Sequence, residues 1–134
     1  MWECSTCKRK FKARNQYHIC TDKEIGELFM EKSDEMVLAF DRIMTSVMVW
    51  KPNHIGASLH SVVFTNKKAW LIVKPMKHEL DVKFYHREHI HSDLVRRYTK
   101  YPNKVAHHLR VSEEDQITAK FLELLRMGYT YAMD

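Results

Sequence analysis

The sequence contains few of the residues that build phosphate loops, disulfide frameworks or membrane spans. Its 134 residues include three glycines, too few for a glycine-rich loop that cradles phosphates. Three cysteines are an odd number, and a chain of this length buries a core without disulfides. No run of about 20 apolar residues occurs, and no apolar segment follows Met1. We therefore expect a soluble cytoplasmic protein that neither contacts a membrane nor depends on disulfides.

Recognisable catalytic arrangements are also missing from the sequence. No nucleophile with a nearby base, no paired-carboxylate motif and no Gly-x-Gly-x-x-Gly pattern can be identified. These absences predict a binding protein rather than an enzyme. A histidine-assisted hydrolase is the remaining enzymatic alternative.

All three cysteines lie in the first 20 residues, where they form a candidate metal site with one histidine. Cys4 and Cys7 have the Cys-x2-Cys spacing that directs two thiolates at one ion. His18 and Cys20 can supply the other two ligands. Three thiolates and one imidazole suit tetrahedral Zn²⁺ and leave no open position, so we predict a structural zinc site. A redox pair and an iron site are the alternatives.

The same segment is strongly basic. It holds five basic residues against the single acid Glu3, whereas the formal net charge of the whole chain is +5. A basic zinc finger of this kind predicts contacts with nucleic-acid phosphates. The alternative is that the charge only keeps a small module in solution. The predicted phosphate-contacting residues are Lys8, Arg9, Lys10, Lys12 and Arg14.

The periodicity of the chain predicts an α+β domain at residues 22–134 after a zinc-finger module at residues 1–21. Apolar residues at helical spacing predict a short helix at about 22–30 and a longer helix at about 34–48, with Ser33 as its N-cap. A short helix is expected after Ser92, and a last helix is expected to begin at Ser112–Asp115. The expected order is α-α-β-β-β-β-α, and its short turns favour an antiparallel sheet with helices on one face. The predicted strands are 58–65, 70–73, 80–85 and 105–111.

Alternation within two of these strands defines a second candidate site. Lys83, His108 and Arg110 occupy the polar positions in the alternation of their strands. We therefore expect them on the open face of the sheet, the face without helices. There they would bind an anionic ligand or an acidic protein partner. The alternative is a solvated face without a ligand. His107 has the apolar phase and is predicted to be a hydrogen-bonded core histidine.

A histidine-rich loop offers a further hypothesis. His86, His89 and His91 could form a second metal site. The alternative is that the loop binds nothing tightly.

Three stretches of the sequence carry a resemblance to a known family. The first is Trp-x-Cys-x2-Cys-x3-Phe followed by Asn-Gln-Tyr-His-x-Cys, and the others are residues 61–66 and 105–111. Together they resemble an uncharacterised bacterial family, the domain of unknown function numbered five-six-five-five. The resemblance covers nearly the whole chain and implies an α/β domain, found in some relatives beside nuclease-like domains. It also implies metal ligands at Cys4, Cys7, His18 and Cys20, but no reaction or substrate.

The leading prediction is thus a zinc-binding, non-enzymatic module whose basic finger contacts nucleic acid. The alternative is a domain that binds a small anion or a protein partner through the open face of its sheet.

Overall fold

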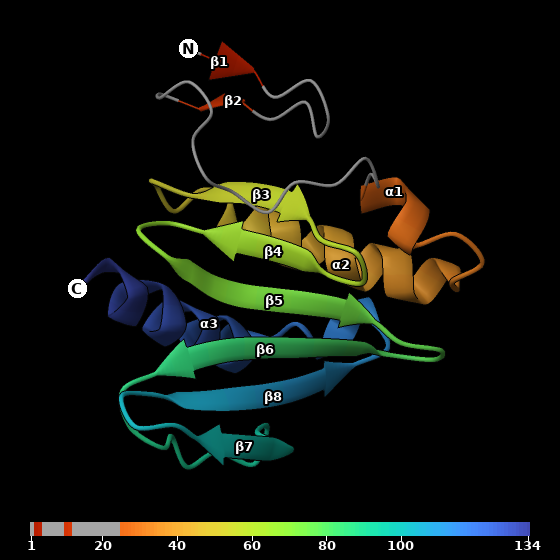
Figure 1. The fold of residues 1–134 in the computed structure, drawn as a ribbon. Helices are drawn as coiled ribbons and strands as arrows, with labels where there is room; N and C mark the ends of the chain where they lie inside the picture. The colour runs from red at the N-terminus through yellow and green to blue at the C-terminus, as the bar shows by residue number, and fades with distance from the viewer. Residues whose placement is uncertain (1, 4–9, 12–24) are drawn as a thin grey trace.

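An antiparallel sheet with helices on one of its faces makes up most of the structure (Figure 1). This computed structural model describes Trp2–Glu3, Lys10–Phe11 and residues 25–134. The first two segments are the short antiparallel strands β1 (Trp2–Glu3) and β2 (Lys10–Phe11), which pair with each other. The predicted zinc ligands Cys4, Cys7, His18 and Cys20 lie outside the described residues, as do Lys8, Arg9, Lys12 and Arg14. Lys10 lies in β2.

The main sheet has six strands in the order β3-β4-β5-β6-β8-β7, and all neighbouring strands are antiparallel. The first four follow one another as a meander. β8 then lies between β6 and β7, so the chain passes from β6 to the edge of the sheet before it returns. The strands are β3 (His54–Ala57), β4 (Val62–Thr65), β5 (Ala69–Pro75), β6 (Leu80–His86), β7 (Arg97–Lys100) and β8 (Val105–Val111).

The α+β class and the antiparallel sheet are confirmed, but the prediction of four strands is wrong. β4, β5, β6 and β8 correspond to the four predicted strands, whereas β3 and β7 were not predicted. β3 follows Pro52 and contains Gly56, which together are typical of a loop. All four residues of β7 are exposed, so the strand has no apolar alternation to mark it.

The first two helices begin close to their predicted positions. α1 (Ile25–Leu28) is short, and α2 (Asp34–Val47) starts after the predicted N-cap Ser33. The Ser33 side chain accepts a hydrogen bond from the backbone N–H of Met36 at 3.2 Å, which satisfies one of the free donors of the first turn.

The predicted start of the last helix is wrong. The segment after Ser112 forms a 3-10 turn, η1 (Glu114–Gln116), because the Gln116 side chain accepts hydrogen bonds from the backbone N–H groups of Ser112 and Glu113 at 2.7 and 2.9 Å. α3 (Ala119–Met133) begins only after Thr118, whose hydroxyl caps it. No helix forms after Ser92 either, since the backbone only turns there.

The core lies between the sheet and the two long helices. α2 and α3 cover one face of the sheet, and α3 lies behind β5 and β6 in Figure 1. Trp70 is fully buried there, and its indole N–H donates to Asn53, which in turn donates to the carbonyl of Val47 at the end of α2. α3 approaches β6 closely at Gly128, where an added Cβ would lie 3.0 Å from the ring of Phe84. Among the helices that the structure describes, none combines the length and apolar character needed to cross a bilayer.

Candidate functional site

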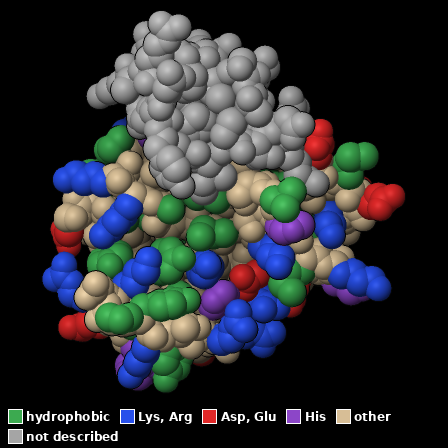
Figure 2. All heavy atoms as spheres, viewed as in Figure 1, with side chains coloured by type: hydrophobic (Ala, Val, Ile, Leu, Met, Phe, Trp, Pro, Cys, Tyr) green, Lys and Arg blue, Asp and Glu red, His purple; other side chains and the backbone are tan. Residues whose placement is uncertain are grey.

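The face of the sheet that is turned away from α2 and α3, here called the open face, carries the candidate site. Successive side chains of a strand point to opposite faces. In β6 the buried Val82 and Phe84 point to the helices, so Asp81, Lys83 and Tyr85 lie on the open face. Figure 2 views the molecule from this side and shows many Lys and Arg side chains over the sheet, with acidic and histidine side chains among them.

Three side chains that can carry positive charge form a line across three neighbouring strands of the open face. Lys83 in β6 is directly opposite His108 in β8, and His108 is directly opposite Arg97 in β7. Residues paired in this way have Cβ atoms about 4.5–5.5 Å apart. We call Lys83, His108 and Arg97 the cationic row. The predicted residues Lys83, His108 and Arg110 do share the open face, but Arg97 was missed because β7 was not predicted as a strand.

The carboxylate of Asp81, near the start of β6 on the open face, engages two of the three predicted ligand-binding residues. His108 Nδ1 lies 3.0 and 3.1 Å from the two carboxylate oxygens of Asp81. Arg110 donates from Nε to Asp81 at 2.9 Å and from Nη1 to Glu79 at 3.0 Å. Burial acts to lower the pKa of Arg110, but the bonds to Glu79 and Asp81 outweigh burial and raise this pKa. Arg110 therefore stays charged and holds Asp81 in place.

The contacts of Asp81 with His108 and Arg110 limit which residues of the open face can contact a ligand. An anion at Arg110 would compete with two carboxylates that are already bonded, so we interpret Arg110 as a positioning residue for Asp81 and His108. Sequence reasoning missed this pairing, although Asp81 has the same strand phase as Lys83. Within the described part of the chain, no carboxylate lies within salt-bridge distance of Lys83, Arg97 or Lys104. These three cations can therefore accept an anionic partner.

An aromatic ring lies among these cations. The ammonium group of Lys104 lies 4.1 Å from the centre of the Tyr85 ring, and that of Lys83 lies 5.6 Å from it. A cation–π contact at an exposed site contributes about 0.5–1 kcal/mol, so either lysine can leave the ring at a small cost. We call Lys83, Tyr85, Arg97 and Lys104 the basic patch.

The neighbouring edge of the sheet is also basic. Residues 96–104 include four basic residues and no acidic residue. Two tyrosines of this segment, Tyr98 and Tyr101, are 44% and 51% exposed. Positive charges on an edge strand also prevent pairing with other strands, and this protective role requires no ligand.

The histidine-rich loop takes part in packing. Within residues 25–134, no group of three or more His, Cys, Asp or Glu side chains is arranged to hold a metal, and this includes His86, His89 and His91. The ring of His89 instead stacks on Tyr98, with 3.8 Å between the ring centres. The centre of the His89 ring is also 5.9 Å from that of His107, and His107 stacks on Phe84 at 4.9 Å.

His107 is the core histidine that strand alternation predicted. Its side chain is fully buried, and Nε2 accepts a hydrogen bond from the backbone N–H of Ile90 at 2.9 Å. Burial, followed by the charges of His89 and His86, lowers the pKa of His107 to about 4. His107 is therefore neutral at neutral pH, and it attaches the segment that leaves β6 to the sheet.

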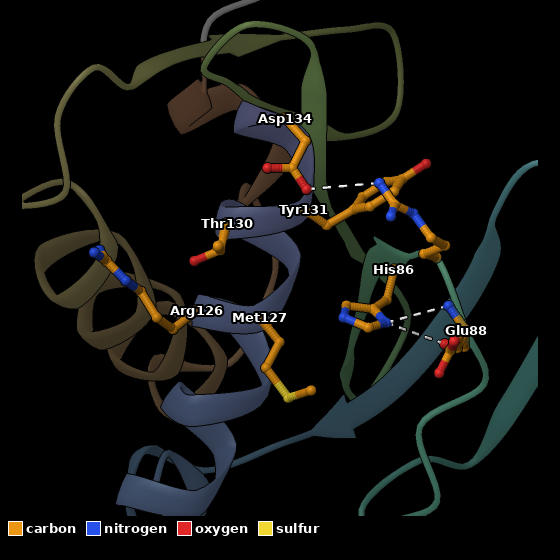
Figure 3. Close-up of a pocket in the computed structure, with 8 residues that line it drawn as sticks. His86, Glu88, Arg126, Met127, Thr130, Tyr131 and Asp134 are labelled. Carbon is orange, nitrogen blue, oxygen red and sulfur yellow. Dashed lines mark hydrogen bonds and ion pairs between the residues drawn. The ribbon is translucent and has the colours of Figure 1, made fainter.

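A hollow of about 450 Å³ lies on the other side of the sheet, between α3 and the end of β6 (Figure 3). An ion pair between Arg87 and Asp134, 3.6 Å long, spans part of it. The hollow is not adjacent to the cationic row, so it does not support ligand binding there. Its lining residues are His86, Arg87, Glu88, Arg126, Met127, Thr130, Tyr131 and Asp134.

Comparison with curated proteins and with solved structures found no match. One family model, described as Domain of unknown function (DUF5655), matches residues 25–132. The match covers the six-stranded sheet, α1, α2 and all but the last residue of α3, including every residue of the open face discussed above. Because the match extends over most of the chain, the protein belongs to the DUF5655 family.

Proposed function

We propose that this protein is a non-enzymatic nucleic-acid-binding module, in which both the N-terminal segment 1–21 and the basic patch contact phosphates. The observation that supports the proposal is that three cations of the open face have no carboxylate partner among the described residues. Unpaired cations on one surface bind polyanions by releasing the counterions of the phosphates. The formal net charge of the whole chain, +5, also favours binding to a polyanion.

The proposal includes a structural Zn²⁺ held by Cys4, Cys7, His18 and Cys20. This part is based on the spacing and chemistry of the four residues. A segment of about 20 residues can bury little apolar surface, so metal binding would supply much of its folding free energy. A cytoplasmic location fits the proposal, because thiols remain reduced there.

The alternative function, binding of a small anion or an acidic protein through Lys83, His108 and Arg110, is less favoured by the geometry. Arg110 donates to two carboxylates, and the Nδ1 atom of His108 is engaged by Asp81. Only Lys83 of the three has no carboxylate partner in the part of the chain that the structure describes. A long polyanion uses scattered cations such as Lys83 and Arg97, whereas a small anion needs several convergent donors.

The test is binding of labelled oligonucleotides to the zinc-loaded full chain at a series of salt concentrations, measured by fluorescence anisotropy. Each phosphate contact contributes about 0.7 to the slope of log K against log salt for a single strand and about 0.9 for a duplex. The triple variant Lys83→Ala/Arg97→Ala/Lys104→Ala should therefore lower the slope by about 2–3. A control that removes the same charge from the half-buried Lys32 and the exposed Arg42 and Lys51, Lys32→Ala/Arg42→Ala/Lys51→Ala, should leave the slope unchanged. Absence of binding to any oligonucleotide at low salt would refute the proposal.

A further inference from the structure

Two adjacent rows of the open face combine positive charge with an aromatic ring. The first is the cationic row, and the second consists of Tyr85, Ala106 and Thr99, which are opposite one another across the same three strands. Neighbouring rows on one face are two residues apart, which is about 6.6 Å along the strands. The ring of Tyr85 is therefore one step from the row that contains Lys83 and Arg97.

Tyr85 differs from its aromatic neighbours in what covers its ring. Phe84 and Tyr98 each stack on a histidine, so their rings are engaged in packing. No aromatic ring stacks on Tyr85 in the part of the chain that the structure describes, where only the ammonium groups of Lys104 and Lys83 lie over it. Both ammonium groups are attached to flexible side chains and can move from the ring to a phosphate. Tyr85 can thus exchange a cation for another flat partner.

We infer that the nucleic acid is single-stranded, and that one of its bases stacks on Tyr85 while adjacent phosphates contact Lys83, Arg97 and Lys104. This inference rests on the proposed function and adds the strand state and the stacking residue. Every base of a single strand has a free flat face that can stack on an aromatic side chain, whatever its sequence. In a duplex those faces are stacked on one another, and the protein meets phosphates and base edges.

The shape of the surface also favours a single strand over a duplex. A major groove admits a helix or a two-stranded ribbon that projects from the protein. Tyr85 instead lies within a broad sheet, with strands on both sides of β6. A duplex on this surface would touch the cations but not the ring, so Tyr85 distinguishes the two kinds of strand.

The experiment compares a labelled 12-nucleotide oligothymidine with a duplex of the same length, using the zinc-loaded full chain. Tyr85→Leu should weaken single-strand binding about 5- to 150-fold, the range for loss of one stacked base, and should leave duplex binding unchanged. Tyr85→Trp should bind the single strand as well as the unchanged protein does. Circular dichroism and thermal unfolding check that both variants are folded.

A second measurement uses the unchanged protein, so it does not depend on the folding of a variant. An oligonucleotide carrying 5-iodouracil is crosslinked by light, and the attachment site is mapped by mass spectrometry. A crosslink at Tyr85 is expected. Equal affinity for duplex and single strand, no effect of Tyr85→Leu, or crosslinks confined to residues 1–21 would each overturn the inference while leaving nucleic-acid binding intact. Failure to bind either oligonucleotide would instead overturn the proposed function.

Discussion

Lowering the pH should destabilise this protein through His107. The pKa of this side chain is about 4 in the folded protein and about 6.5 in an unfolded chain. The unfolded state therefore binds a proton at a higher pH than the folded state does. Stability that is fully present above pH 6.5 is lost progressively as the pH falls toward 4. Linkage gives a loss of about 2 kcal/mol between pH 8 and pH 5 from this one group.

The variant His107→Phe isolates this contribution. Phenylalanine keeps an aromatic ring between Phe84 and His89, but it cannot titrate and cannot accept the hydrogen bond from Ile90. At pH 8 the variant should be less stable by about 0.5–1.5 kcal/mol, because the partly buried N–H of Ile90 loses its hydrogen bond. At pH 5 the advantage of the unchanged protein should be smaller by about 2 kcal/mol.

The assay is urea denaturation at pH 8, 7, 6 and 5, with the free energy of unfolding obtained by linear extrapolation. Titrating groups remote from His107, including any metal ligands, contribute equally to both proteins, so the difference between them reports His107 and its coupling to His89 and His86. His60→Ala, which removes an exposed histidine, is the control and should follow the unchanged protein at every pH. Parallel curves for His107→Phe and the unchanged protein would refute the reasoning.

Three further predictions concern the metal and the packing of α3. Chelation of zinc should unfold the N-terminal segment but leave the α+β domain folded, because the domain has its own core; a single transition in circular dichroism that includes both would contradict this. His18→Ala should weaken zinc binding at least 10- to 100-fold in a competition assay with a chromogenic chelator, and unchanged affinity would mean that His18 is not a ligand. Gly128→Ala should destabilise the protein by about 1–2 kcal/mol in urea, since overpacking against Phe84 outweighs the gain in helix propensity. Gly26→Ala, with nothing within 4 Å of its added Cβ, should not be destabilising.

The strands that could be predicted from the sequence are those with many buried residues. β6 and β8 alternate because every second residue packs against the helices, and that alternation is visible in the sequence. The edge strands β3 and β7 bury less, so burial leaves little pattern in them. The position of β8 between β6 and β7 depends on contacts between distant residues, and local periodicity does not encode such contacts.

The same distinction applies to the candidate site. Alternation alone placed Lys83, His108 and Arg110 on one face, because the side-chain period of a strand is fixed. The pairing of Asp81 with Arg110 and the alignment of Arg97 with His108 require the register between strands, which the sequence did not reveal. The zinc site and the basic finger stay predictions, because their residues lie outside those that the structure describes or, for Lys10, in a strand whose side chains it does not describe.

The insertion of β8 between β6 and β7 places the basic patch across two zones of unequal local stability. β8 is paired along both edges and is mostly buried, so its amide hydrogens should exchange only when the sheet opens globally. β7 is paired along one edge and its four residues are exposed, so it can open more readily than β8. Lys83 lies in β6, which is also paired along both edges, so it belongs to the part of the sheet that exchanges slowly. Arg97 lies in β7, the part that opens readily. Any ligand that contacts both would hold β7 on the sheet, and slower hydrogen exchange in β7 would report its binding.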